Sequence, residues 1–196
     1  MGDSLLILPD NALVALVGMS GAGKTTFASR HFSPSQVLTS DRFREMVSDN
    51  QNSMQASKDA FEVLYLIARK RLARGLLTVI DATNIQDFAR AKLFELAEEH
   101  GAPLVAVVLN VPLEIAMERT LKRTDRPFGS DVVMEHYREF QETMDVIHTE
   151  GFQSIHLLDG VQAIDQAIIT TQTSPPFPVD QSPVIAAPMN GIRLST

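Results

Sequence analysis

The sequence of residues 18–25, GMSGAGKT, constrains this chain more than any other segment. It has the pattern Gly, four variable residues, Gly, Lys, Thr, which is typical of a phosphate-binding loop (P-loop). Such a loop needs a buried strand before it and a helix after it. The apolar residues 12–17 predict the strand, and residues 24–31 predict the helix. The chain is therefore expected to form an α/β fold that binds a nucleoside triphosphate.

Each fixed position of this motif has a physical role. Glycines let the backbone curve so that its N–H groups approach phosphate oxygens, and the dipole of the following helix adds attraction. Lys24 supplies a charge near the β- and γ-phosphates, and the hydroxyl of Thr25 is a ligand for Mg²⁺. The alternative is a glycine-rich turn that binds nothing. We predict that ATP and Mg²⁺ bind here, with ATP contacted by Gly18, Ser20, Gly21, Ala22, Gly23, Lys24, Thr25 and Thr26.

Short apolar segments alternate with helical patterns along the rest of the chain. Further strands are predicted at residues 36–40, 76–84, 104–110 and 152–158. Helices are predicted at residues 41–48, 57–74, 87–99, 113–126, 131–149 and 161–170. Buried strands that alternate with helices indicate a parallel sheet covered on both faces. The predicted fold class is α/β, a P-loop kinase-type three-layer sandwich with a parallel sheet of about five strands and an arginine-rich lid.

The overall composition excludes several classes of protein. The chain has no cysteine, which excludes disulfides and thiolate metal sites. It has no apolar segment of the length that spans a membrane, and its first residues lack the basic segment of a signal peptide. We therefore expect a cytoplasmic protein. The net charge of −7 argues against a generic nucleic-acid coat protein but is compatible with a local basic site.

The composition changes at about residue 171. Five of the ten prolines lie between Pro175 and Pro188, in a segment with little charge and no periodicity. We predict a P-loop domain over residues 1–170 and a mostly irregular, proline-rich tail over residues 171–196.

Acidic residues that follow the predicted strands are the next candidates, because ligands of parallel α/β sheets lie beyond the carboxyl ends of the strands. Asp41 can accept the proton of a hydroxyl that attacks a γ-phosphate, and Arg44, one helical turn later, can hold an anionic group on the acceptor. Asp81 resembles the acidic position that holds Mg²⁺ through water. The alternatives are a helix cap at Ser40 or Asp41 with a solvated arginine, and a loop cap at Asp81.

Three arginines lie where P-loop kinases place a lid. Arg119, Arg123 and Arg126 have the spacing i, i+4, i+7, which is one face of a helix. Arginines at such a lid close over the phosphates and stabilise charge in the transition state. We predict that all three contact ATP and that Arg123 is catalytic. The choice of arginine over lysine favours bidentate phosphate contacts, and the alternative is a solvated basic face.

Several stretches together resemble one family. They are GMSGAGKTTFASRHF, VLTSDRFREMVSD, KDAFEVLYLIARKRLARGLLTVIDATN and RTLKRTDR. Over residues 13–158 the chain is similar to the 5′-kinase module of bacterial polynucleotide kinase-phosphatases of the RNA-repair type. The resemblance implies transfer of the γ-phosphate of ATP to 5′-OH ends of RNA or DNA, with Mg²⁺, in nucleic-acid end repair. It also implies that Asp41 is the general base, that Arg44 contacts the phosphate flanking the terminal nucleoside, and that the lid arginines cover ATP.

The chain departs from that family in one respect. The family's kinase module is followed by a phosphatase, for which this chain has no room. Separate phosphatase and ligase partners are therefore expected, or the chain is one module of a larger enzyme. From the residues alone, two alternatives stay open: a P-loop kinase of a small-molecule hydroxyl acceptor, and an ATP-binding regulatory protein without transferase activity.

Overall fold

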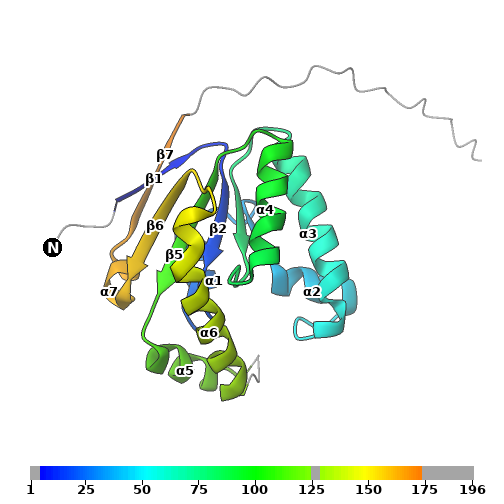
Figure 1. Ribbon diagram of the computed structural model, residues 1–196. Helices are drawn as coiled ribbons and strands as arrows, with labels where there is room; N and C mark the ends of the chain where they lie inside the picture. The colour runs from blue at the N-terminus through cyan, green and yellow to red at the C-terminus, as the bar shows by residue number, and fades with distance from the viewer. Residues whose placement is uncertain (1–4, 125–128, 174–196) are drawn as a thin grey trace, which may run out of the picture.

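A five-stranded parallel sheet forms the centre of the molecule in the computed structural model, which describes residues 5–124 and 129–173 (Figure 1). Its strand order is β3-β4-β2-β5-β6. The strands are β2 (Leu13–Val17), β3 (Val37–Thr39), β4 (Thr78–Asp81), β5 (Leu104–Asn110) and β6 (Ser154–Asp159). All five strands that the sequence predicts are confirmed, and they lie parallel to one another.

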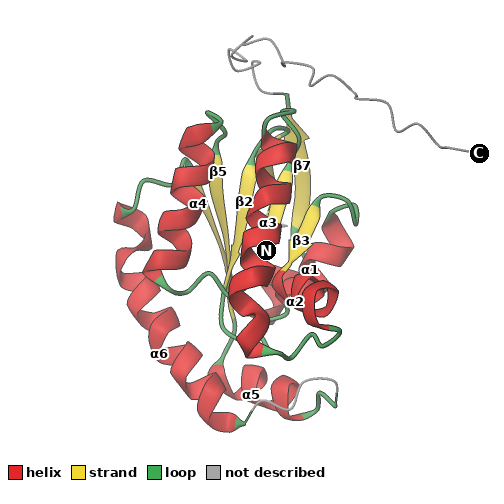
Figure 2. Ribbon diagram, turned by 90° about the vertical axis from the view of Figure 1, so that its right-hand side faces the viewer, coloured by secondary structure: helices red, strands yellow, loops and turns green. Residues whose placement is uncertain are grey.

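Helices cover both faces of this sheet, as Figure 2 shows. They are α1 (Lys24–His31), α2 (Ser40–Ser48), α3 (Ser57–Leu72), α4 (Asp87–Glu99), α5 (Leu113–Leu121), α6 (Ser130–Val146) and α7 (Gly160–Asp165), with short 3₁₀ helices η1 (Met54–Ala56) and η2 (Ile147–Thr149). The chain runs outward from β2 to β3 and then returns across the sheet through β4 and β5. Because such crossovers are right-handed, this reversal places α1 on the face opposite α3, α4 and α6. The predicted α/β sandwich is confirmed.

The central strands are buried on both sides, which explains their continuous apolar sequence. Every residue of β2 is buried, and β5 is buried except at Asn110. In the register of the sheet, Leu16 lies beside Asp81 of β4, and Val17 lies beside Val108 of β5. The loops that follow β2 and β4 therefore leave the sheet at the same edge.

A second, two-stranded parallel sheet pairs β1 (Leu5–Pro9) with β7 (Ile168–Gln172). The predicted helix over residues 161–170 is wrong in its second half, because α7 ends at Asp165 and β7 begins at Ile168. The β-branched residues 168–171 suit an extended strand better than a helix. Thr171 and Gln172, which the sequence assigned to the tail, belong to β7, and residues 174–196 lie outside the described residues.

None of the helices within residues 5–124 and 129–173 combines the length and the apolar character that crossing a membrane requires.

Candidate active site

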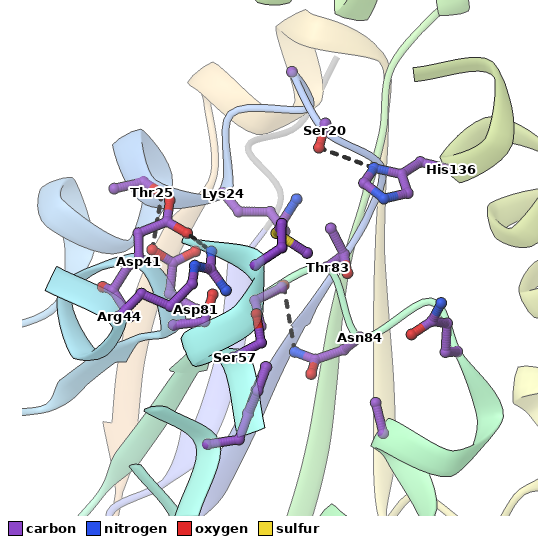
Figure 3. Close-up of a pocket in the computed structure, with 18 of the residues that line it drawn as sticks. Ser20, Lys24, Thr25, Asp41, Arg44, Ser57, Asp81, Thr83, Asn84 and His136 are labelled. Atoms are coloured by element: carbon purple, nitrogen blue, oxygen red, sulfur yellow. Dashed lines mark hydrogen bonds and ion pairs between the residues drawn. The ribbon is translucent and has the colours of Figure 1, made fainter. Parts of the chain in front are cut away.

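The P-loop joins β2 to α1 at the carboxyl edge of the sheet (Figure 3). Gly21 and Gly23 have φ angles of 82° and 96°, in the left-handed region that other residues rarely adopt. Gly23 is the N-terminal cap of α1, and its carbonyl accepts a hydrogen bond from Phe27 N at 2.9 Å. The first N–H groups of α1 consequently face the concave turn, where they and the helix dipole attract an anion.

Lys24 places a positive charge at the base of this turn. Its ammonium donates hydrogen bonds to the carbonyl oxygens of Gly18 at 2.8 Å and Met19 at 2.9 Å. The residue is only 8% exposed, so the ammonium is held by these carbonyls rather than by bulk water. Its contact with the β- and γ-phosphates stays a prediction.

Thr25 and Asp81 form a second polar pair beside the loop. The Thr25 hydroxyl donates a hydrogen bond of 2.8 Å to Oδ2 of Asp81. Burial raises the pKa of the Asp81 carboxyl above its usual range, although the charge of Lys24 and the bond from Thr25 oppose this effect. Two oxygen donors side by side fit Mg²⁺, which prefers oxygen ligands and keeps several waters. Thr25 and Asp81 are thus the residues that would hold the predicted metal, directly or through water.

Asp41 and Arg44 form an ion pair in the same cavity as Lys24 and Thr25 of the P-loop (Figure 3). Both lie on α2, which follows β3, and their spacing of three residues places them on one side of the helix. Asp41, Arg44 and Asp81 line the same cavity. Burial raises the pKa of the Asp81 carboxyl, and the negative charge of Asp41 acts in the same direction. The predicted gathering of these three side chains at one edge of the sheet is what the structure shows.

The alternative interpretation of this segment as a simple helix cap does not describe the structure. Thr39 occupies the cap position of α2 and makes no side-chain capping bond. Arg44 is 5% exposed, and its Nε donates to the carbonyl of Gln51 at 2.9 Å. A buried arginine anchored by a backbone carbonyl is fixed in position, unlike a solvated one.

The loop after β4 is tied to the P-loop by hydrogen bonds. The N–H of Gly18 donates to the carbonyl of Thr83 at 3.0 Å. The side-chain amide of Asn84 donates to the carbonyl of Leu16 at 2.8 Å and is buried. These bonds fix the loop that follows Asp81 relative to the phosphate-binding turn.

The three predicted lid arginines have different surroundings. Arg119 lies on α5, and its Nη1 is 3.4 Å from the carbonyl oxygen of Gly21 and 3.5 Å from that of Ala22. The prediction of one helix over residues 113–126 is wrong, because α5 ends at Leu121 and Arg123 follows it as an exposed residue that still lines the cavity. Arg126 lies outside the described residues. Of the three arginines predicted to share one face of a helix, only Arg119 lies on α5.

Packing between α5 and the P-loop is very close. A Cβ atom added to Gly21 would lie 2.3 Å from the carbonyl oxygen of Ala116 and 2.8 Å from the hydroxyl oxygen of Thr120. No side chain fits at such distances, so Gly21 is required both for its φ angle and for this contact. The contact sets the position of Arg119, which lies on the same helix.

His136 is a contact that sequence reasoning missed. Its Nδ1 lies 2.9 Å from the hydroxyl of Ser20 in the P-loop, as Figure 3 shows. The residue is on α6, more than a hundred residues away in sequence. An isolated histidine in a helix carries no sequence signal for such a contact, and only the packing of α6 creates it.

A buried ion pair behind the site was also missed. Arg90 on α4 is 2% exposed and donates to both carboxylate oxygens of Glu150, at 2.7 and 2.6 Å. Its Nη1 also donates to the carbonyl of Asn84 at 3.2 Å and to the hydroxyl of Thr143 at 3.1 Å. The sequence could have indicated that Arg90 is buried, because its spacing places it on the same helix face as the apolar residues Leu93 and Ala97, which are buried.

A cavity of about 1030 Å³ lies in front of the Arg90–Glu150 pair. Its lining includes much of the P-loop, the Asp41–Arg44 pair, Asp81, Arg119, Arg123 and His136, and it extends between the first turns of α3 and α4. A smaller hollow of about 260 Å³ adjoins the main cavity and is lined by residues of the P-loop, α1 and α7 and by Arg119. Gly23, Thr26 and Arg119 line both.

A P-loop after the central strand of a parallel sheet, with carboxylates at the ends of neighbouring strands, defines a P-loop nucleotide-binding domain of the kinase type. A family model agrees with this class: the AAA domain family matches residues 13–147. The chain belongs to that family.

The curated relatives of the chain are kinases with different acceptors. It is 26% identical over 142 residues to an L-seryl-tRNA(Sec) kinase of Methanococcus maripaludis, covering 65% of this chain and 52% of that protein. It is 21% identical to a candidate bifunctional polynucleotide kinase/RNA ligase of Autographa californica nuclear polyhedrosis virus, covering 65% of this chain and 20% of that one. An adenylyl-sulfate kinase of Myxococcus xanthus is 28% identical, over 55% of this chain and 62% of the relative. The chain thus spans between a fifth and about three fifths of these proteins.

Solved structures share the fold. A chain of the PezAT toxin-antitoxin system of Streptococcus pneumoniae superposes with a TM-score of 0.60 at 19% identity, covering 85% of this chain and 72% of that one. Kti12 of Chaetomium thermophilum, solved in complex with ADP-AlF3, superposes with a TM-score of 0.57 at 18% identity, and the match covers 79% of this chain and 94% of Kti12. At these identities the likeness establishes the fold alone.

Proposed function

We propose that this chain is an ATP-dependent polynucleotide 5′-hydroxyl kinase, which transfers the γ-phosphate of ATP to 5′-OH ends of RNA or DNA. The observation that carries the proposal is the Asp41–Arg44 ion pair, which lines the same cavity as Lys24 of the P-loop. A carboxylate beside an arginine suits an acceptor that offers a hydroxyl and carries a phosphate nearby. The similarity to a candidate viral polynucleotide kinase/RNA ligase supports the same acceptor class.

In this proposal ATP binds across the P-loop. The N–H groups of the loop and the ammonium of Lys24 hold the phosphates, and the nucleoside occupies the smaller hollow, next to Arg119. Mg²⁺, held at Thr25 and Asp81, would neutralise charge on the β- and γ-phosphate oxygens. Arg119 and Arg123 line the main cavity and would contact the phosphates from the side of α5. Arg126, for which the same contact is predicted, lies outside the described residues.

The acceptor enters from the other side of the cavity. Asp41 accepts the proton of the 5′-hydroxyl while the oxygen of that hydroxyl forms a bond to the γ-phosphorus. The bond between the γ-phosphorus and the β–γ bridging oxygen breaks, and ADP leaves. Arg44 donates hydrogen bonds to the phosphate on the 3′ side of the terminal nucleoside, which positions the hydroxyl for attack in line.

The product, a 5′-phosphorylated end, is what a nucleic-acid ligase needs. The proposed role is therefore nucleic-acid end repair in the cytoplasm, together with a phosphatase and a ligase that act on the same ends.

The test is transfer of label from γ-labelled ATP to matched 5′-OH RNA and DNA oligonucleotides, with 5′-phosphorylated oligonucleotides as a control. Wild type should label only the 5′-OH ends. Asp41→Asn should lower kcat about 10²–10⁴-fold, the range for loss of a general base, and leave the Kd for ATP unchanged. Asp59→Asn, an exposed carboxylate in the first turn of α3 that does not line the cavity, should behave like wild type.

The same assay separates the rival functions. Transfer to sugars, nucleosides or adenylyl sulfate but to no oligonucleotide would identify a small-molecule kinase, which the similarity to an adenylyl-sulfate kinase favours. ATP binding without transfer to any acceptor would identify a regulatory protein.

A further inference from the structure

The main cavity continues past Asp41 into a groove between α3 and α4. Both helices begin at the edge of the sheet where the P-loop lies, and their first turns face each other across the groove. We call this part of the cavity the aromatic groove; it is lined by Lys58, Phe61, Glu62, Tyr65, Phe88 and Lys92. The mechanism proposed above uses none of these residues.

Three aromatic rings line this groove on two helices. Phe61 and Tyr65 are one turn apart on α3, with ring centroids 5.6 Å apart and planes tilted by 34°, and both pack partly against the core. Phe88, in the first turn of α4, is 67% exposed, although folding favours burial of such a ring. Two rings are thus held in place by packing, while the third offers its surface to a ligand.

Two lysines of the groove can contact phosphates. Lys58 on α3 makes no ion pair or hydrogen bond within the described part of the chain. Lys92 on α4 pairs with Glu95 at the surface, where both side chains are well exposed and such pairs contribute little free energy. Among the described lining residues beyond Asp41 and Asp81, the only carboxylate is Glu62. Burial, with the charge of Glu95, raises the pKa of Tyr65 to about 12, so its phenol stays neutral.

We propose that the aromatic groove binds the nucleobases of a single-stranded 5′-end. Phe88 stacks on a base above the rings of Phe61 and Tyr65, and Lys58 and Lys92 contact the phosphates that follow the Arg44 contact. The inference rests on the proposed function for its acceptor class. The proposal concerns single-stranded ends because a base needs a free face to stack on a side chain. In a duplex, both faces of every internal base are covered by neighbouring bases. Stacking is available to every base, so the groove confers little sequence preference.

The test compares Phe88→Ala, Phe88→Trp and wild type on single-stranded 5′-OH oligonucleotides. Phe88→Ala should raise KM for the oligonucleotide by about 5- to 150-fold, the range for loss of one stacked base, with kcat and KM for ATP unchanged. Phe88→Trp should keep the wild-type KM. Leu66→Ala, an exposed apolar residue of α3 that does not line the cavity, should also keep it.

An abasic scan of the acceptor identifies stacking as the cause. An abasic nucleotide at one of the first three positions should raise the KM of wild type by the same factor as Phe88→Ala does. In the Phe88→Ala protein, the same abasic nucleotide should cause no further rise in KM. An equal effect of Phe88→Ala on intact and abasic acceptors at every position would overturn the inference. Equal KM values for single strands and for 5′-OH ends at a nick, where the terminal base is stacked on both faces, would also overturn it. If wild type transfers phosphate to oligonucleotides and Phe88→Ala changes nothing, the inference fails while the proposed function stands. If wild type labels no oligonucleotide, both fail.

Discussion

The two sides of the main cavity are built from different parts of the chain. On the phosphate side, the contacts are made largely by main-chain atoms: Lys24 is held by two carbonyls, Gly18 donates to the carbonyl of Thr83, and Gly21 faces the carbonyl of Ala116. On the other side, which the proposed function assigns to the acceptor, side chains of α2, α3 and α4 make the surface, and Phe88 is mostly exposed.

This difference separates the recognition of phosphate, which many kinases share, from the recognition of a particular acceptor. A main-chain cradle recognises phosphate oxygens whatever the rest of the ligand is, so many kinases can share it. A surface of side chains on three helices changes with each substitution and can suit one acceptor. The curated relatives of this chain have different acceptors.

Arg90 gives the largest expected effect, because its hydrogen bonds hold the loop between the two sides. Arg90→Met leaves the carboxylate of Glu150 and the carbonyl of Asn84 without their donor. We expect the free energy of unfolding to fall by about 3–5 kcal/mol, measured by urea denaturation. Arg69→Met removes an exposed ion pair with Glu99 and should cost about 0–1 kcal/mol. An equal fall in the free energy of unfolding in the two variants would show that the buried pair stabilises the fold no more than the exposed pair.

The next prediction contrasts one residue from each side. Lys24→Met removes the charge next to the phosphates and should lower kcat about 10²–10³-fold for every acceptor. Arg44→Lys keeps a charge but loses the planar guanidinium, so it should reduce the preference for a nucleoside 3′-phosphate over a nucleoside. The measurement is kcat/KM for the two acceptors in each variant. The comparison breaks down if Lys24→Met changes acceptor preference or if Arg44→Lys leaves it unchanged.

Gly21 tests how tightly α5 holds the phosphate side. Gly21→Ala meets the carbonyl of Ala116, whereas Gly75→Ala, at a similar positive φ, has no atom within 4 Å. Both variants carry backbone strain, and we expect Gly21→Ala to lose about 1–3 kcal/mol more stability because of the clash. Only Gly21→Ala should weaken ATP binding. Thermal unfolding without ATP measures the stability of each variant, and the rise in Tm on adding ATP reports its ATP binding. Equal stability and equal ATP binding in the two variants would contradict the clash.

The smallest expected effect concerns the pH dependence of stability at Asp81. Burial raises the pKa of its carboxyl in the folded state, so folding is favoured when the group is protonated and this contribution is lost as pH rises through the raised pKa. Asp81→Asn should therefore unfold like wild type in acid and be more stable than wild type at neutral pH, while losing activity with Mg²⁺. Urea denaturation at about pH 4 and pH 8 measures this, and a pH-independent difference would contradict it.

The phosphate side could be predicted from sequence because its geometry depends on local constraints. Glycine positions and a preceding apolar strand determine a P-loop, and the periodicity of apolar residues gave all five strands of the main sheet. The carboxylates at the strand ends followed from the sheet topology. Position after a strand was enough to predict that Asp41, Arg44 and Asp81 lie in one cavity.

The remaining features depend on tertiary packing. His136 reaches Ser20 only because α6 packs beside the P-loop, and Arg90 meets Glu150 across 60 residues of sequence. The end of α5 at Leu121 was missed because the arginine spacing continued the helical period beyond it. The β1–β7 pair joins segments from the two ends of the described chain, and no local pattern predicts such a pairing.

The shared wall between the two hollows bears on how the reaction proceeds in time. Gly23, Thr26 and Arg119 line both the main cavity and the smaller hollow. Under the proposed function the acceptor occupies the first and the nucleoside the second, so both substrates can be bound at the same time. Neither substrate has to leave for the other to enter. Initial-rate kinetics should therefore show intersecting lines, with either substrate able to bind first, and no phosphorylated form of the protein should accumulate between the two.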